Sequence, residues 1–217
     1  MEVITAIIDF VLHIDKHLVE IVNAYQVWTY LILFLIIFAE TGLVVTPFLP
    51  GDSLLFATGA ILAKPETDLH ILIMAVLLIV AAILGDLVNY HVGKYVGPVA
   101  FSGKYKLLKK EYLERTQHFY VKHGGKTIIY ARFIPIVRTF APFVAGVGTM
   151  PYAKFASFNI VGGVLWVSSF LFLGYYFGGL PLIKDNFTYV IFAIIIFSIL
   201  PPLIELFKGK KVKRKLD

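Results

Sequence analysis

Two long apolar stretches of this chain are interrupted by prolines and charged residues that an ordinary membrane-spanning helix does not tolerate. The first, residues 27–63, contains Glu40, Pro47 and the run Leu49-Pro50-Gly51-Asp52. It is nearly twice as long as the roughly 20 residues that one span needs. Proline breaks or kinks a helix, so we expect the chain to enter and leave the membrane here as a hairpin that bends near Pro50-Gly51.

The second interrupted stretch, residues 127–150, contains Arg132, Pro135, Arg138 and Pro142. A charge at the centre of a bilayer costs at least ~2.5–3.5 kcal/mol on insertion scales, and charged residues at that depth face protein or water. Two arginines in so short a stretch therefore exclude a span that faces lipid. We expect a second hairpin here.

The other hydrophobic residues fall into continuous runs. Hydrophobic residues make up 59% of the 217 residues and charged residues only 16%, whereas a soluble domain carries about 25% charged residues. The runs predict membrane spans at about 69–100, 153–178 and 186–206. With the hairpins they form a single membrane domain, 26–207, which leaves no room for a soluble catalytic domain. The chain has no cysteine, which excludes disulfides, thiolate nucleophiles and iron–sulfur clusters.

The ends of the chain and its long loop are more polar than this domain. Residues 1–25 have apolar residues at helical spacing with a polar face, which predicts an amphipathic helix at the membrane surface. Seven of the 20 Lys and Arg residues lie in the 102–126 loop and six in the tail, 208–217. Basic clusters beside spans mark the cytoplasmic side, so we place both there and expect no binding of nucleic acid. His13 and His17 have no evident third ligand, and we expect no metal and no other cofactor.

The two halves of the chain resemble each other. Phe56-Ala57-Thr58-Gly59 corresponds to Phe143-Val144-Ala145-Gly146, and Gly93-Lys94-Tyr95-Val96-Gly97 to Gly174-Tyr175-Tyr176-Phe177-Gly178. The match is short, and shared membrane composition could also produce it. With the basic loop and tail in the cytoplasm, the first hairpin enters from outside and the second from inside. The sequence thus predicts an all-α integral membrane protein, an inverted repeat of a re-entrant helical hairpin plus transmembrane helices, as in many secondary transporters.

Two further features of the spans favour structural roles. Gly93 and Gly97 are four residues apart, as are Gly174 and Gly178, and this spacing indicates close helix packing rather than a ligand site. Tyr90, Tyr95 and Tyr175 are most simply interface aromatics.

Four charged residues lie inside the hairpins, and their formal charges cancel: Glu40, Asp52, Arg132 and Arg138. The economical arrangement brings the hairpins together, so that each acid meets a basic partner or lines a wet cavity. Arginine binds phosphate through parallel hydrogen bonds and stays charged, so Arg132 and Arg138 are candidates for binding an anionic headgroup. Glu40 and Asp52 are candidates for proton coupling, because the environment of a buried carboxylate can bring its titration into the working pH range.

A structural alternative stays open for each polar residue. All four charges could form ion pairs that lock the hairpins together, and Asp52, which follows Pro50-Gly51, could cap the next helix. Asp86 and Asn89 stand three residues apart on the 69–100 span. They either extend the polar cavity or bond to neighbouring helices.

These residues belong to segments that resemble the bacterial DedA family nearly from end to end. The segments are Phe38-Ala39-Glu40-Thr41-Gly42, Phe48-Leu49-Pro50-Gly51-Asp52-Ser53-Leu54-Leu55, Gly85-Asp86 to Asn89-Tyr90, His123-Gly124-Gly125-Lys126, and Ala131-Arg132-Phe133-Ile134-Pro135 through Arg138-Thr139 to Ala145-Gly146. The resemblance implies a re-entrant-hairpin fold shared with the eukaryotic VTT-domain lipid scramblases. It also implies that the functional acids are Glu40 and Asp52 and the functional arginines Arg132 and Arg138.

The resemblance further implies transport of polyprenyl phosphate or another phospholipid across the bacterial cytoplasmic (inner) membrane. We expect a multi-pass flippase with a cytoplasmic C-terminus that returns undecaprenyl phosphate to the inner leaflet, driven by protons, and no enzymatic activity. Its expected partners are the lipid substrate, the bilayer and protons, and a homo-oligomer stays open. The alternatives are a proton-coupled exporter of small molecules and, less favoured, a membrane lipid phosphatase, for which the chain lacks Ser-Gly-His and His-Glu-x-x-His patterns.

Overall fold

The computed structural model describes most of the expected membrane domain. The described residues are 24–43, 51–65, 67–100 and 124–184, with 22, 186, 189, 190, 193 and 194. Within them every regular element is a helix and none is a strand, which confirms the all-α fold. The predictions that fall largely or wholly outside them are the 1–25 helix, the 102–126 loop, the 186–206 span and the 208–217 tail.

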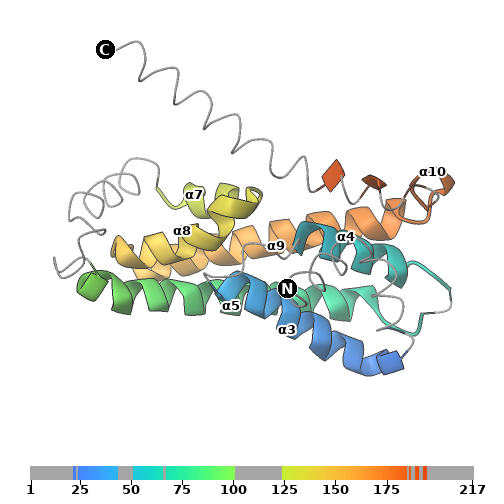
Figure 1. The fold of residues 1–217 in the computed structure, drawn as a ribbon, viewed down its shortest axis with the longest axis horizontal. Helices are drawn as coiled ribbons and strands as arrows, with labels where there is room; N and C mark the ends of the chain where they lie inside the picture. The colour runs from blue at the N-terminus through green and yellow to red at the C-terminus, as the bar shows by residue number, and fades with distance from the viewer. Residues whose placement is uncertain are drawn as a thin grey trace, which may run out of the picture.

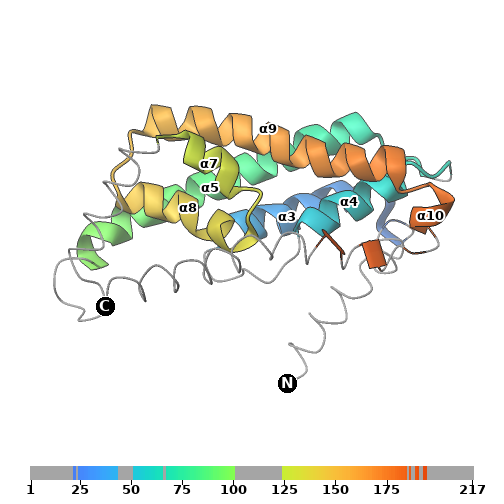
Figure 2. The ribbon, with the colours of Figure 1, turned by 90° about the horizontal axis from the view of Figure 1, so that it is seen from above.

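Two long helices form the frame of this fold. The elements in chain order are η1 (Gln26–Trp28), α3 (Thr29–Gly42), α4 (Gly51–Leu62), α5 (Ile71–Ala100), α7 (Lys126–Ala131), α8 (Pro135–Val147), α9 (Tyr152–Phe177) and α10 (Pro181–Lys184). In the described part, α5 and α9 are the helices long and apolar enough to cross a membrane. At 1.5 Å per residue they measure roughly 45 and 39 Å, against about 30 Å of bilayer hydrocarbon. They lie side by side and run in opposite directions (Figures 1 and 2).

A pair of short helices precedes each long helix. α3 and α4 run in opposite directions, as do α7 and α8. The end of α3, the start of α4 and the break between α7 and α8 lie near the middle of the long helices (Figures 1 and 2). Helices α3, α4 and α8 are each only about 18–21 Å long, too short to cross the hydrocarbon. The breaks follow the sequence: α3 ends at Gly42, α4 begins at Gly51, and α8 has Pro135 in its first turn, where the missing N–H of proline is harmless.

Glycines bring α4 of the first pair into contact with α9 of the second half. A Cβ on Gly59 would overlap the carbonyl oxygen of Leu171, and a Cβ on Gly174 would overlap the carbonyl oxygen of Phe56. The two backbones can therefore touch only because both positions lack a side chain.

The same contact recurs between α8 and α5. A Cβ on Gly146 would overlap the carbonyl oxygen of Tyr90, and one on Gly93 would overlap that of Phe143. Each of these four residues is the counterpart, in the alignment of the two halves, of a residue in the α4–α9 contact. The prediction that the spaced glycines serve close helix packing is confirmed.

We expect alanine at these glycines to push the helices apart. Gly59→Ala and Gly174→Ala should each lower the free energy of unfolding by about 1–3 kcal/mol, the usual range for overpacking. The measurement is unfolding in mixed micelles of increasing dodecyl sulfate. Gly179→Ala is the control, because a Cβ at Gly179 meets nothing within 4 Å. Equal stability of the Gly174 and Gly179 variants would contradict the close contact.

The buried apolar residues form two clusters, one on each side of the polar centre. The larger includes Leu55, Leu78 and Trp166, and the smaller includes Tyr90 and Phe155. The interpretation of Tyr90 as an interface aromatic is wrong: its side chain is buried and stacks on Phe155 with 4.4 Å between ring centroids. Its hydroxyl donates a hydrogen bond to the carbonyl oxygen of Met150, which satisfies the polar end of a buried tyrosine.

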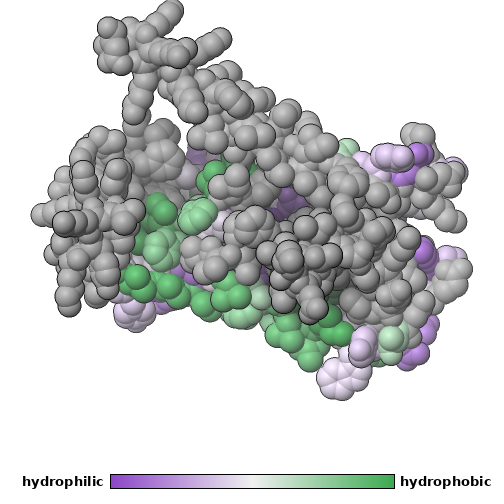
Figure 3. All heavy atoms as spheres, in the orientation of Figure 1, coloured by the Kyte–Doolittle hydropathy of each residue, from purple (hydrophilic) through white to green (hydrophobic). Residues whose placement is uncertain are grey.

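The outer face of α5 is a continuous apolar stripe. Its large exposed side chains follow one another every fourth residue: Leu72, Val76, Val80, Leu84, Val88, Val92 and Val96. Figure 3 shows apolar side chains gathered along the edge formed by α5 and α3. A soluble monomer rarely exposes a contiguous patch of this kind. The stripe is what a helix presents to lipid chains.

Candidate functional site: two buried arginine clusters

The first cluster joins both pairs of short helices through Arg138. Arg138 lies in the first turn of α8, Glu40 near the end of α3, and Asp52 in the first turn of α4. The Nη1 of Arg138 donates to Oδ1 of Asp52 at 2.9 Å, and its Nη2 pairs with Oε1 of Glu40. The exposed fractions are 3% for Arg138, 1% for Glu40 and 4% for Asp52. One guanidinium is therefore shared by two carboxylates at the point where the helix pairs meet.

Helix α9 adds Trp166 to this cluster. The indole Nε1 donates to Oδ1 of Asp52 at 2.7 Å, and the guanidinium carbon of Arg138 lies over the ring, 4.7 Å from its centroid. An arginine over a tryptophan face makes a favourable cation–π contact. Sequence reasoning missed Trp166, although a tryptophan N–H in a long uncharged run signals a need for a buried acceptor.

Gly51 fixes the carboxylate of Glu40. Its N–H donates to Oε1 of Glu40 at 3.0 Å, so the acid accepts a hydrogen bond from the N-terminus of α4, where a negative charge is favourable. A Cβ at this position would stand 2.6 Å from the carboxyl carbon of Glu40. The glycine of the Pro-Gly-Asp run therefore makes room for an acid that comes from another helix.

The second cluster holds Arg132 against the two long helices. Arg132 follows the last residue of α7, and its Nη2 lies 2.6 Å from Oδ2 of Asp86 on α5. The same nitrogen donates to Oδ1 of Asn159 on α9. Asn159 in turn donates to the carbonyl oxygen of Ile83 at 3.1 Å. Both Arg132 and Asp86 are 1% exposed.

Sequence reasoning expected each acid of the hairpins to meet a basic partner or line a wet cavity but did not assign the pairs, and the structure divides the charges between two clusters. Glu40 and Asp52 share Arg138, while Arg132 pairs with Asp86. Asn159 was missed, and the signal for it was an amide inside an apolar run, where a polar side chain needs a partner.

Asn89 lies between the clusters and bonds to neighbouring helices. Its Nδ2 donates to the carbonyl oxygens of Thr41, at 3.3 Å, and Thr139, at 2.8 Å. It thereby ties the end of α3 and the start of α8 to α5. Of the two roles open to Asp86 and Asn89, Asn89 makes the helix-bonding contacts and Asp86 forms a buried ion pair.

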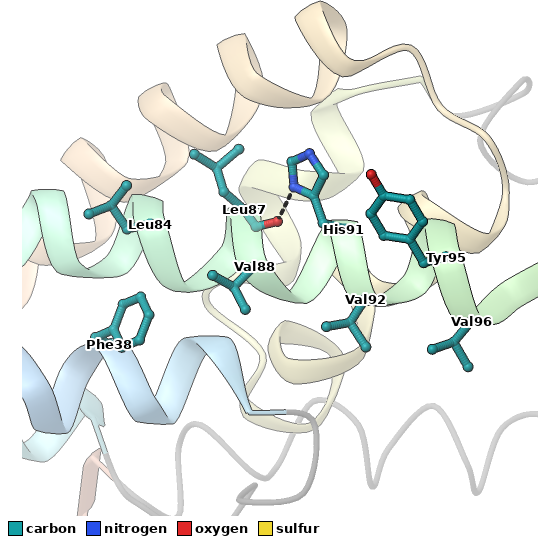
Figure 4. A pocket seen from close by; sticks show the side chains of 8 residues that line it. All are labelled: Phe38, Leu84, Leu87, Val88, His91, Val92, Tyr95 and Val96. Carbon is teal, nitrogen blue, oxygen red and sulfur yellow. Dashed lines mark hydrogen bonds between the residues drawn. The ribbon is translucent and has the colours of Figure 1, made fainter.

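An apolar groove of about 540 Å³ lies on the outer side of α5. Figure 4 shows its lining residues: Phe38, Leu84, Leu87, Val88, His91, Val92, Tyr95 and Val96. The Nδ1 of His91 is hydrogen-bonded to the carbonyl oxygen of Leu87 at 2.7 Å. On α5, Asp86 and Asn89 therefore face the protein interior, and the residues that line the apolar groove face outward.

Comparisons with known proteins agree with a membrane protein of one family. Residues 49–176 match the VTT domain, a range that holds every residue of both clusters except Glu40. The chain is 55% identical over 212 residues to protein DedA of Escherichia coli K12, covering 97% of each chain. It is 39% identical over 158 residues to the inner membrane protein YqjA of the same strain, covering 70% of this chain and 69% of that one. An uncharacterized membrane protein of Mycobacterium tuberculosis H37Rv is 40% identical over 181 residues, with coverage of 83% and 79%. No solved structure matches the chain.

Proposed function

The chain belongs to the DedA family of VTT-domain membrane proteins, and we propose that it moves a lipid phosphate between the leaflets of the bacterial inner membrane. The substrate is undecaprenyl phosphate or a related phospholipid, and the driving force is the proton gradient. The observation that carries this proposal is the pair of fully buried arginine clusters where the short helices meet. Buried charges at membrane depth mark substrate and proton pathways.

In this proposal the two pairs of short helices are re-entrant hairpins of an inverted repeat. Three features support it. The short helices cannot cross the hydrocarbon; the end of α3, the start of α4 and the α7–α8 break lie near mid-length of the long helices; and the glycine contacts of the two halves correspond pair by pair. Broken helices that meet near the bilayer midplane are a common construction of secondary transporters. In the proposed multi-pass topology the basic loop and the C-terminus lie in the cytoplasm, because their Lys and Arg clusters favour that side.

Labelling of single cysteines tests this topology. Lys109→Cys and Lys210→Cys should both react only from the cytoplasmic face, because the positive-inside rule places both segments there. Gly179→Cys should react only from the outside, and the chain has no cysteine of its own to interfere. Labelling of positions 109 and 210 from opposite faces would contradict the hairpin arrangement.

The arginines supply the affinity for phosphate. A guanidinium offers a planar fork that matches phosphate oxygens, and the resulting charge-assisted bonds are strong in a site without water. In the structure each guanidinium is paired with a carboxylate, so an arriving phosphate would take the place of a carboxylate of similar charge and geometry. Because the phosphate replaces the carboxylate, the arginine is never left in the membrane without a negatively charged partner.

The Arg138 cluster supplies the coupling to protons. It has two carboxylates for one guanidinium, and thus one excess negative charge, which a single proton neutralises. Oε2 of Glu40 accepts no hydrogen bond from the described residues, so Glu40 is the carboxylate we assign to the coupling proton, with Asp52 as its partner. The apolar stripe and groove of α5 would contact the chains of the lipid.

Two other functions make different predictions. A lipid phosphatase would release phosphate from its substrate, whereas a translocase returns the lipid intact. An exporter of small molecules would move a soluble solute across vesicles that contain no lipid phosphate. The test is the exposure of labelled undecaprenyl phosphate in each leaflet of proteoliposomes, with free phosphate measured in the same samples. Exchange between leaflets with no phosphate released supports the proposal, and phosphate release would overturn it.

A further inference from the structure

We propose that the two arginines have different tasks: Arg132 binds the phosphate, Asp86 is the carboxylate that the phosphate displaces, and Asn159 positions the guanidinium. This inference rests on the proposed function and specifies the headgroup site within it. The ligand class is a phosphate monoester.

Arg138 is the less available of the two arginines. Both of its terminal nitrogens are held by carboxylates, from Glu40 and Asp52, and its face lies on Trp166. A phosphate at this site would have to displace two negative charges, each fixed by a further contact. Gly51 donates to Glu40 and Trp166 donates to Asp52.

Arg132 has spare binding capacity. Its contacts to Asp86, to Asn159 and to the carbonyl oxygen of Ala82 all use the single nitrogen Nη2. Within the described residues its Nε and Nη1 have no hydrogen-bond partner, although the side chain is 1% exposed. A guanidinium has five N–H donors, and buried donors without partners are what an incoming phosphate can satisfy.

Asp86 is held by electrostatics more than by hydrogen bonds. Neither of its carboxylate oxygens accepts a hydrogen bond from the described residues, so its ion pair with Arg132 is its main fixed contact. A carboxylate with one partner is more easily displaced than one with two. Asp86 also attracts Arg138, so its displacement from Arg132 would be felt in the other cluster, which links phosphate binding to the coupling site.

Arg132 lies in a break between two helices and packs against glycines of α9. Arg132-Phe133-Ile134 separates α7 from α8, and irregular backbone at membrane depth is tolerated where it lines a cavity or is buried in protein. The arginine crosses α9 at two glycines: a Cβ on Gly162 would lie 3.0 Å from its Cδ, and a Cβ on Gly163 would lie 3.6 Å from its Nη2. At these two positions α9 therefore places no side chain against Arg132, and Asn159 of the same helix bonds to its guanidinium.

The experiment measures binding of farnesyl phosphate to the full chain in detergent by titration calorimetry, with farnesol and inorganic phosphate as separate probes. Arg132→Lys keeps the charge but loses the fork, and should weaken the affinity for farnesyl phosphate by ~10-fold or more. Arg138→Lys makes the same change in the other cluster and should weaken the affinity by less than ~3-fold, because in this division of tasks the ligand does not touch Arg138. Lys154→Gln, which removes an exposed cation of α9, is the control and should leave the affinity unchanged. Farnesol should not bind at this site. Equal affinity for inorganic phosphate would assign the site to free phosphate and overturn the lipid assignment.

Two neighbouring substitutions shift the affinity in opposite directions. Asp86→Asn removes the internal competitor and should tighten binding by ~10-fold, while Asn159→Asp gives Arg132 a second carboxylate and should weaken it by a similar factor. A purely structural role for these residues would weaken binding in both variants. If Asp86→Asn does not elute as a single peak in size exclusion, the comparison of Arg132→Lys with Arg138→Lys still distinguishes the proposed roles from purely structural ones.

The outcomes for site and function are separable. Wild-type affinity in the Arg132→Lys variant, with binding lost in Arg138→Lys, overturns the division of tasks even if the wild type moves lipid. Binding through Arg132 in a protein whose wild-type proteoliposomes move no lipid supports the site and overturns the translocase. Trp166 offers a second readout, because it is the sole tryptophan in a Trp28→Phe background. Its fluorescence should respond to farnesyl phosphate when Arg132 is present and should not respond in the Arg132→Lys variant.

Discussion

Arg138→Gln is expected to abolish transport and to lower the free energy of unfolding by about 3–5 kcal/mol, the usual effect of removing one partner from a buried ion pair. Glu40 and Asp52 would then lie close together inside the protein without a counter-charge. Unfolding in mixed micelles measures the stability. Lys154→Gln removes an exposed cation from α9 and is the matched control, expected to change stability by less than about 0.5 kcal/mol.

A charge-free variant separates stability from function. Replacing Glu40, Asp52 and Arg138 together by Gln, Asn and Gln removes all buried charge from the cluster, and such replacements are often close to neutral. This triple variant should recover most of the lost stability and none of the transport. If Arg138→Gln alone were as stable as the Lys154 control, the cluster would not join the short helices as the structure indicates.

Glu40→Gln is expected to keep the fold and lose the response of transport to a pH gradient. Glutamine preserves an oxygen that can accept from Gly51 and Arg138, but it cannot load or release a proton. The rate of lipid exchange in proteoliposomes should then be the same at every imposed gradient. Glu40→Asp, which can still titrate, should retain part of the response.

The gradient experiment has a clear contrary result. If Glu40→Gln responds to the gradient as the parent does, Glu40 is not the coupling residue. Asp52 would then be the next candidate, since it shares Arg138, followed by Asp86, which lies in the other cluster.

The sequence was sufficient to locate the breaks and the polar residues. Prolines and glycines fix backbone geometry locally. A break near Pro50-Gly51, where α4 begins, and a second break within residues 127–150, where α8 begins at Pro135, could therefore be predicted from the sequence. The charges of Glu40, Asp52, Arg132 and Arg138 stand out because membrane burial is costly. The glycine spacing of α5 and α9 likewise predicted close packing.

The partners of each arginine could not be predicted, because they depend on how helices far apart in the chain register against one another. Arg132 and Arg138 are only six residues apart, yet the break at Ile134 and Pro135 sends one toward Asp86 and the other toward Glu40 and Asp52. Nothing local distinguishes the two arginines. The net charge of each cluster would be the same if the two arginines exchanged places, so electrostatics alone leaves the choice open.

The neutral members of the clusters were missed for a related reason. Trp166 and Asn159 lie in the uncharged run 155–183, and both look like ordinary residues of a membrane helix in the sequence. Their importance comes from the cross-packing of α9 on both pairs of short helices. An inward-facing Asn or Trp on a span therefore merits the same attention as a buried charge.

The most direct test of lipid-phosphate transport is a leaflet-exposure assay with fluorescent undecaprenyl phosphate in sealed proteoliposomes. A membrane-impermeant reagent that quenches the outer leaflet is added before and after a proton gradient is imposed. The proposed mechanism predicts that the wild type exchanges the lipid between leaflets, faster under the gradient, and that Arg132→Lys and Arg138→Lys vesicles of equal protein content exchange it much more slowly. A quenched fraction that matches protein-free vesicles at every gradient would contradict it.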